Sequence, residues 1–214
     1  MVSAGLLLAA ASSGQRAAGI KPLAAGCELR SGQLLNGDAL ILQEASSVKL
    51  DYELVNPVAL EMPIAPHVAA RRAGVEITAR GLAANFEKFD EYEIDILVVE
   101  GAGGWLVPLN DSETMADLCV ACDFPVLLVV GMRLGCLNHA LLTAAAIGDA
   151  GATLTGWVAN CVDPEMTALD ENLQTLQARL PGRFLGVVPY LGSDCTPANF
   201  MRYLDARSAF ALSS

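Results

Sequence analysis

Several short segments of this chain are apolar at almost every position, without the alternating polar residues of a half-exposed strand. Residues 96–99 read ILVV, and residues 126–130 read VLLVV. Such strands are buried on both faces, which happens when helices cover both sides of a mostly parallel sheet. This pattern restricts the possible folds more than any other feature of the sequence.

Helical patterns separate the strand segments along the chain. The sequence predicts strands over residues 17–23, 94–99, 126–130, 155–162 and 184–188. It predicts helices over residues 2–13, 38–45, 65–73, 78–89, 114–121, 137–149 and 167–179. Strands that alternate with helices indicate one α/β domain over residues 1–214, with a mostly parallel sheet flanked by helices on both faces.

The charge and the cysteines exclude several classes of protein. The 13 Lys and Arg against 24 Asp and Glu give a net charge of −11 with no basic block, so nucleic acid is not an expected partner. No apolar run reaches the roughly 18 residues of a membrane span, and the apolar N-terminal segment lacks the basic start of a signal peptide. The six cysteines lie in apolar contexts, as free thiols do, so we expect a cytoplasmic protein.

Cys119 and Cys122 form a C-x-x-C pair inside a predicted helix. The pair has no second C-x-x-C and no nearby histidine to complete a zinc site. We interpret both residues as helix thiols without a metal.

In parallel sheets ligands bind beyond the carboxyl ends of the strands, so polar residues there are site candidates. Lys21 directly follows the first predicted strand, and Glu100 follows residues 94–99. Asp38 begins a helix, where an acid is also favoured by the helix dipole. Lys21 could be a surface lysine or a fixed cation for an anionic substrate. Asp38 and Glu100 could be structural or could bind Mg²⁺, which accepts carboxylates and leaves room for phosphate oxygens.

Three glycines follow Glu100 in the segment GAGGWL, and they permit a close backbone approach. The segment does not match the dinucleotide-binding pattern G-x-G-x-x-G, because Leu106 occupies the last position. The turn alone is therefore weak support for a nucleotide site.

Further candidates follow the later strands. The segment LGCLNHA, residues 134–140, opens a helix whose free N–H groups favour an anion, with Asn138 and His139 adding polar groups. His139, like His67 in another helix, also fits a structural role. Asn160 ends a strand, and its amide can pair with an adenine edge. The loop VVPYLG, residues 187–192, could cover a base.

Taken together and in this order, the segments resemble dethiobiotin synthetase, an ATP-dependent enzyme of biotin synthesis. The resemblance is carried by GIKPLAAG, NGDAL, VVEGAGGW, RLGCLNHALLT, LTGWVAN and LGVVPYL. It implies a fold like that of P-loop nucleotide hydrolases, a homodimer, and a carbon–nitrogen ligase. The implied substrates are 7,8-diaminononanoate, carbon dioxide and ATP, with Mg²⁺ as cofactor.

The resemblance also implies roles for individual residues. Lys21 would be catalytic, and Asp38 and Glu100 would bind the metal and ATP. ATP would further contact Gly101, Ala102, Gly103, Asn160, Cys161, Pro189, Tyr190 and Leu191. The diamine substrate would contact Ala25, Cys136, Leu137 and Asn138, the last three from the neighbouring subunit.

The chain departs from the family pattern at two places. Ala25 stands where the family usually has a serine, and the 214 residues contain no G-x-x-x-x-G-K-[ST] phosphate loop. Met1–Ser3 matches the helix that follows that loop. The resemblance therefore predicts a sheet without its first strand, and a chain that is a poor catalyst and only marginally stable.

Three alternatives to an active synthetase stay open at the level of sequence. One is another nucleotide-binding enzyme of the same group, such as a partitioning ATPase. The second is a non-catalytic remnant that binds ATP without turnover. The third is a structural fragment that binds no ligand. A mis-started fragment of a P-loop-type ATP-binding protein, with its start codon assigned too late, would also account for the missing loop.

Overall fold

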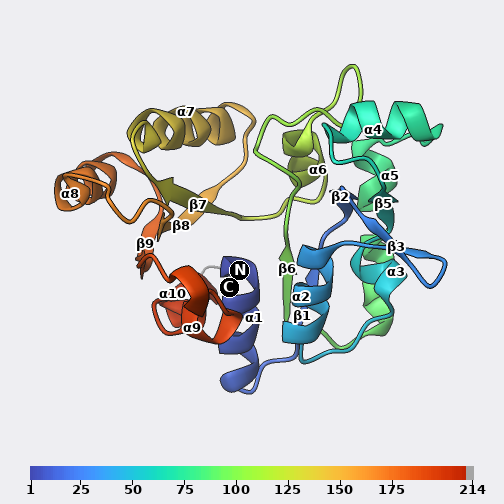
Figure 1. Ribbon diagram of the computed structural model, residues 1–214, viewed down its shortest axis with the longest axis horizontal. Helices are drawn as coiled ribbons and strands as arrows, with labels where there is room; N and C mark the ends of the chain where they lie inside the picture. Colours follow the sequence, from blue (N-terminus) through green and yellow to red (C-terminus); the bar gives the residue numbers. More distant parts are fainter. Residues whose placement is uncertain (211–214) are drawn as a thin grey trace.

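The structure, a computed structural model, describes residues 1–210 and is organised by two parallel sheets (Figure 1). In the first sheet β1 (Ala17–Ile20) pairs with β6 (Ile96–Val99). In the second, β8 (Leu154–Cys161) pairs on one edge with β7 (Val126–Met132) and on the other with β9 (Arg183–Val188). The predicted parallel α/β architecture is confirmed, and the long apolar runs form the strands.

Shorter strands were not predicted from the sequence. β2 (Leu23–Ala25) pairs with β5 (Val58–Leu60) in parallel, and β3 (Glu28–Arg30) forms an antiparallel pair with β4 (Gln33–Leu35). The predicted strand over residues 17–23 is divided into β1 and β2. Pro22 lies at the division, where its missing N–H prevents a continuous ladder.

Helices surround the sheets and include several short segments that the sequence did not predict. They are α1 (Val2–Ser12), α2 (Gly37–Ala45), α3 (Tyr52–Val55), α4 (Pro66–Ala73), α5 (Ala79–Ala83), η1 (Phe86–Glu91), α6 (Met115–Ala121), α7 (Cys136–Asp149), α8 (Leu169–Arg179), η2 (Gly192–Asp194), α9 (Pro197–Met201) and α10 (Ala206–Phe210). No helix within residues 1–210 is long and apolar enough to cross a membrane.

The single helix predicted over residues 78–89 is wrong, because α5 ends at Ala83 and η1 begins at Phe86. The Thr78 hydroxyl accepts a hydrogen bond from the first turn of α5. The Asn85 side chain donates to the Gly81 and Leu82 carbonyls at the other end of this helix. An asparagine that binds nearby carbonyls competes with helix continuation, so the helix stops early.

Helix α1 is apolar around its whole circumference and lies between the two sheets (Figure 1). Leu7 belongs to an apolar cluster that contains Ala17 of β1 and has side chains of β6 packed against it. Leu6 belongs to another cluster, with Val158 of β8. A helix that is apolar on all sides is expected to be buried on all sides, so α1 joins the two halves of the core.

The two sheets do not form one continuous ladder, because β6 and β7 are not hydrogen-bonded to each other. Within residues 1–210, β6 pairs only with β1, and β7 pairs only with β8. Both strands are apolar, yet every residue of β6 is partly exposed and Val129 of β7 is 41% exposed. Interior strands of a parallel sheet are normally paired on both edges and buried. This division agrees with the predicted sheet that lacks one strand.

Candidate active site

Lys21, Asp38 and Glu100 meet at the carboxyl end of the β1–β6 sheet. Because Ile20 is paired with Val99, the next residues, Lys21 and Glu100, leave neighbouring strands at the same level. The Lys21 Nζ atom lies 2.9 Å from Glu100 Oε1 and 3.5 Å from Asp38 Oδ2. The prediction that these three side chains converge is confirmed, while their chemical roles stay predictions.

Asp38 reaches this place because Asn36 fixes the start of α2. The Asn36 Oδ1 atom accepts hydrogen bonds from the backbone N–H groups of Asp38 and Ala39 at 3.0 and 3.2 Å. This is an N-cap, which satisfies N–H groups that have no partner inside the helix. The Asp38 side chain remains largely exposed, so one oxygen is accessible to a ligand from solvent.

Lys21 is 7% exposed, and a buried ammonium is stable only when it is paired. Its partners are the two carboxylates and the Gly101 carbonyl, which accepts from Nζ at 3.3 Å. Burial by itself raises the pKa of Glu100. The nearby Lys21 ammonium and hydrogen bonds from Ser3 and Lys21 outweigh it and lower this pKa below its usual value. Glu100 is therefore a carboxylate at neutral pH.

The lowered pKa of Glu100 predicts a loss of stability in acid. A free glutamate has a pKa of 4.5, so the unfolded chain binds a proton at a higher pH than the folded chain does. The contribution of Glu100 is thus complete above that value and is lost as the pH falls through the lower folded-state pKa. We expect the urea midpoint of Glu100→Gln to fall less than that of the unmodified chain between about pH 5 and pH 3.

Urea titrations at a series of pH values measure this effect. Glu165→Gln is the matched control. Glu165 is exposed, so its replacement should leave the fall of the urea midpoint at acid pH unchanged. An equal fall of the urea midpoint in acid for Glu100→Gln and the unmodified chain would contradict the lowered pKa of Glu100.

The start of α1 also lies near this place, because the Ser3 side chain is one of the groups that lower the pKa of Glu100. The first N–H groups of a helix lack partners inside the helix and favour anions. Ser3 was not among the predicted site residues. A serine in the first turn of an apolar helix is the only signal that the sequence offered for it.

The residues expected at the adenine lie together on the second sheet. Asn160 of β8 is paired with Val188 of β9, so it ends level with the start of the loop at Pro189. Cys161 follows Asn160, and in the loop Tyr190 is 53% exposed. The structure thus brings Asn160 and Cys161 to the same sheet end as the segment of residues 189–191.

The expected substrate-binding residues begin α7. Gly135 precedes this helix in the left-handed region with φ 92°, and no side chain caps the first turn. Cys136 is buried, Leu137 is partly buried, and Asn138 is exposed beside His139. The helix start is thus accessible to an anion, with Asn138 as its polar side chain.

Ala25 and His67 offer less to a ligand. Ala25 ends β2 and packs against an apolar cluster, so it supplies no hydrogen-bonding side chain. The His67 Nδ1 atom is buried and has no hydrogen-bond partner among the described residues.

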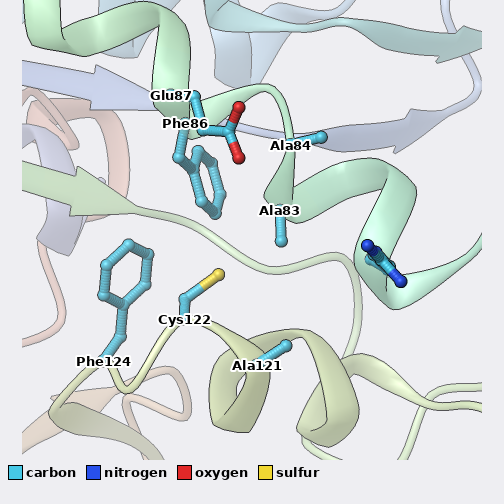
Figure 2. Close-up of a pocket in the computed structure, with 8 residues that line it drawn as sticks. Ala83, Ala84, Phe86, Glu87, Ala121, Cys122 and Phe124 are labelled. Atoms are coloured by element: carbon cyan, nitrogen blue, oxygen red, sulfur yellow. The ribbon is translucent and has the colours of Figure 1, made fainter.

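A separate open pocket of about 290 Å³ lies between η1 and α6 (Figure 2). The rings of Phe86 and Phe124 lie 5.3 Å apart at its wall, and Cys122 is beside them. Burial, and to a smaller extent Cys119, raises the pKa of Cys122 to about 11, so this thiol is protonated and unreactive at neutral pH. None of the predicted ligand-binding residues lines this pocket.

No group of three or more His, Cys, Asp or Glu residues that could hold a metal occurs within the described part of the chain. The two carboxylates of Asp38 and Glu100 are too few for a metal whose ligands all come from the protein, but they suit Mg²⁺. Mg²⁺ usually binds one or two carboxylates and takes its other ligands from phosphates and water. The donor set at this sheet end is therefore suitable for a metal–nucleotide complex.

Comparison with known proteins agrees with the fold. Residues 1–198 match a family described as AAA domain. The chain is also similar to the MinD cell division protein of Aquifex aeolicus, with a TM-score of 0.55 and 13% identity over 100% of this chain and 90% of that chain. The matched domain and the fold define an AAA-domain protein with a MinD-like α/β fold, and the predicted α/β fold is confirmed.

The sequence relatives define the family more narrowly. The chain is 52% identical over 206 residues to the ATP-dependent dethiobiotin synthetase BioD of Pseudomonas paraeruginosa, which covers 96% of this chain and 90% of that protein. It is 51% identical over 191 residues to the protein of the same name from Cellvibrio japonicus, covering 89% and 83% of the two chains. The chain belongs to the dethiobiotin synthetase family, as its sequence segments indicated.

Proposed function

We propose that this chain is an ATP- and Mg²⁺-dependent dethiobiotin synthetase, a ligase that closes the cyclic urea of dethiobiotin in biotin biosynthesis. The observation that carries the proposal is the 52% identity to such a synthetase over 96% of the chain. The convergence of Lys21, Asp38 and Glu100 supports it, because these groups suit a phosphoryl transfer.

The proposed reaction joins 7,8-diaminononanoate and carbon dioxide. One amine of the diamine adds carbon dioxide and loses a proton, which gives a carbamate. A carbamate oxygen attacks the γ-phosphorus of ATP, and ADP leaves. The second amine then attacks the carbamoyl carbon and expels phosphate, which closes the ring. Each step conserves atoms and needs no oxidant or reductant.

Phosphoryl transfer depends mainly on positioning and on neutralising charge. The buried Lys21 ammonium supplies a fixed positive charge beside the acceptor carbamate and the transferred phosphoryl group. Bound Mg²⁺ would neutralise phosphate oxygens. Asp38 and Glu100 would hold the metal, and Lys21, which pairs with Glu100 in this structure, would contact the substrate.

The remaining expected contacts bind the adenine of ATP and the carboxylate of the diamine. Asn160 has an amide that can donate to and accept from an adenine edge, and residues 189–191 lie at the same sheet end. The open first turn of α7, with Asn138, would bind the carboxylate of the diamine. Ala25 would contact the diamine only through its methyl group.

An assay of each component tests the proposal. The chain is incubated with diaminononanoate, bicarbonate, ATP and Mg²⁺, and dethiobiotin is measured by mass spectrometry, with each component omitted in turn. We expect product only in the complete mixture. Calorimetric titration with ATP and Mg²⁺ separates the outcomes: binding without product would indicate a non-catalytic ATP-binding protein, and the absence of both would refute the proposal.

We further propose that the enzyme is a homodimer joined near the start of α7. Leu134 is 97% exposed and Leu142 is 61% exposed, and burial of such side chains by a second copy would be favourable. Leu134→Asp is expected to shift the chain to the monomer in sedimentation velocity. Leu29→Asp, at a 66% exposed leucine of the β3 strand, is the control and should leave the dimer intact. A dimer that withstands Leu134→Asp would place the interface elsewhere.

We propose a cytoplasmic location, supported by the six cysteines, which are all free thiols. Fractionation of cells that express the chain tests this, and recovery with the periplasm or the membranes would contradict it.

A further inference from the structure

Lys21 and Asp38 are connected behind the site by a chain of hydrogen bonds that passes through α3. The Asn36 backbone N–H donates to the Tyr52 hydroxyl at 2.7 Å, and this hydroxyl donates to Asn56 Oδ1 at 3.2 Å. The Asn56 Nδ2 atom donates to the Lys21 carbonyl at 2.7 Å. Asn36 is also the cap of the helix that carries Asp38, so the two ends of the chain of bonds are the two site residues.

The direction of each bond in this chain is fixed by its neighbours. Tyr52 has one hydroxyl proton, and because its oxygen accepts from Asn36, the proton is directed to Asn56. That contact fixes which side of the Asn56 amide faces Lys21. Burial raises the pKa of Tyr52, and the hydrogen bond from Asn36 reduces this effect without cancelling it, so the hydroxyl stays protonated at neutral pH.

The two asparagines of this chain of bonds are buried, and the Tyr52 hydroxyl between them is part-buried. Asn56 is 3% exposed and Asn36 is 9% exposed. A buried donor or acceptor that loses its partner costs more than an ordinary hydrogen bond contributes, so neighbouring backbone is expected to move until a partner is found. Movement there displaces the end of β1 or the start of α2.

We infer that Tyr52, with Asn36 and Asn56, is a positioning residue that holds Lys21 and Asp38 in a single geometry for the proposed reaction. The inference rests on the proposed function of Lys21 and Asp38. Tyr52 acts through the backbone at Lys21 and through the cap of α2, and it needs no contact with a substrate.

This role predicts a particular kinetic pattern. The phosphoryl-transfer step requires a fixed relative position of the Lys21 and Asp38 side chains. The diamine carboxylate, in contrast, is proposed to bind at the start of α7. Loss of positioning therefore lowers kcat and raises the Mg²⁺ concentration needed for half activation. It should change KM for the diamine much less than kcat, because the proposed contact with the diamine carboxylate is made at the start of α7.

Tyr52→Phe tests the role by removing one oxygen atom. Tyr92→Phe is the matched control, because Tyr92 packs against the same apolar cluster as Tyr52. We expect Tyr52→Phe to lower kcat about tenfold, as for a buried hydrogen-bonding group left unpaired. We also expect faster hydrogen exchange at the backbone amides of Asp38 and Ala39. Tyr92→Phe should keep the unmodified values.

A second pair of variants makes the test independent of whether Tyr52→Phe folds. Asn36→Ala removes the cap of α2 and should lower kcat in the same way, whereas Asn36→Ser should restore it, because serine caps helices about as well as asparagine. Unchanged kcat per folded molecule in both Tyr52→Phe and Asn36→Ala would overturn the inference. If the unmodified chain forms no dethiobiotin, the proposed function fails, and the exchange of the Asp38 and Ala39 amides still decides the positioning role.

Discussion

Replacing Glu100 by Gln is expected to lower kcat for dethiobiotin formation by about 100- to 1,000-fold, the range seen when one group that stabilises transition-state charge is removed. The amide has nearly the shape of the carboxylate but carries no charge to hold Mg²⁺ beside ATP. Steady-state kinetics at saturating ATP and Mg²⁺ measure the effect. A variant that kept most of its turnover would refute the role of Glu100.

Glu100→Gln is also expected to lower the stability of the folded chain, because Glu100 is the nearest partner of the buried Lys21 ammonium. Glu100→Gln leaves Lys21 with Asp38 at 3.5 Å and with the Gly101 carbonyl at 3.3 Å. The double variant Lys21→Met, Glu100→Gln removes both charges and is the stability control. Loss of turnover in the single variant at a temperature where both variants are folded separates the chemistry from the fold.

Lys21→Ala is expected to affect the chemical step more than ATP binding. The adenine is proposed to bind near Asn160 on the other sheet, where this change has no contact. Calorimetry should give an ATP affinity close to that of the unmodified chain while single-turnover product formation is lost. A loss of ATP affinity that accounts for the whole effect would make Lys21 a binding residue.

The second large effect concerns the division between β6 and β7. Extending the chain before Met1 by one apolar strand and a glycine-rich phosphate loop is expected to raise Tm by about 10 °C and to increase dethiobiotin formation. The edges of β6 and β7 that lack a partner within residues 1–210 could then pair with the added strand. The partly exposed side chains of both strands would become buried.

The size of this effect follows from a balance of two terms. A strand of about 5–6 residues buries four or five side chains at roughly 1.5–3 kcal/mol each, and ordering it costs about 1–2 kcal/mol per residue. A net gain of roughly 3 kcal/mol shifts Tm by about 10 °C for a chain of this size. An extension of equal length made of Gly and Ser is the control. Equal melting temperatures and equal product formation for the two extended chains would contradict the account.

The sequence predicted the large parallel architecture because long apolar runs have few alternatives. The strands predicted over residues 94–99 and 126–130 became β6 and β7, whose boundaries lie within two residues of the predicted ones. Three-residue strands such as β2 and β5 are too short to show a recognisable alternation of apolar and polar residues. The stop at Ala83 depended on which carbonyls the Asn85 side chain reaches, and that choice is made in three dimensions.

The candidate site was predicted in part for the same reason. Lys21 and Glu100 follow strands, so the rule for parallel sheets placed both at one end, and the register of Ile20 with Val99 brought them together. Tyr52 and Asn56 were not predicted, because they lie behind the site in a four-residue helix and its end. Their significance comes from contacts over long sequence distances, for which an isolated sequence gives no signal.

The most direct test of the central claim locates the metal. The chain is prepared with its Asp and Glu carboxylates labelled with a magnetic isotope of carbon. ATP is bound with Mn²⁺ in place of Mg²⁺. Electron–nuclear double resonance then detects the labelled carboxylates that bind the metal. The account predicts coupling to two protein carboxylates, one lost in Asp38→Asn and the other in Glu100→Gln. Identical spectra for the unmodified chain and both variants would contradict a metal shared by Asp38 and Glu100 beside Lys21.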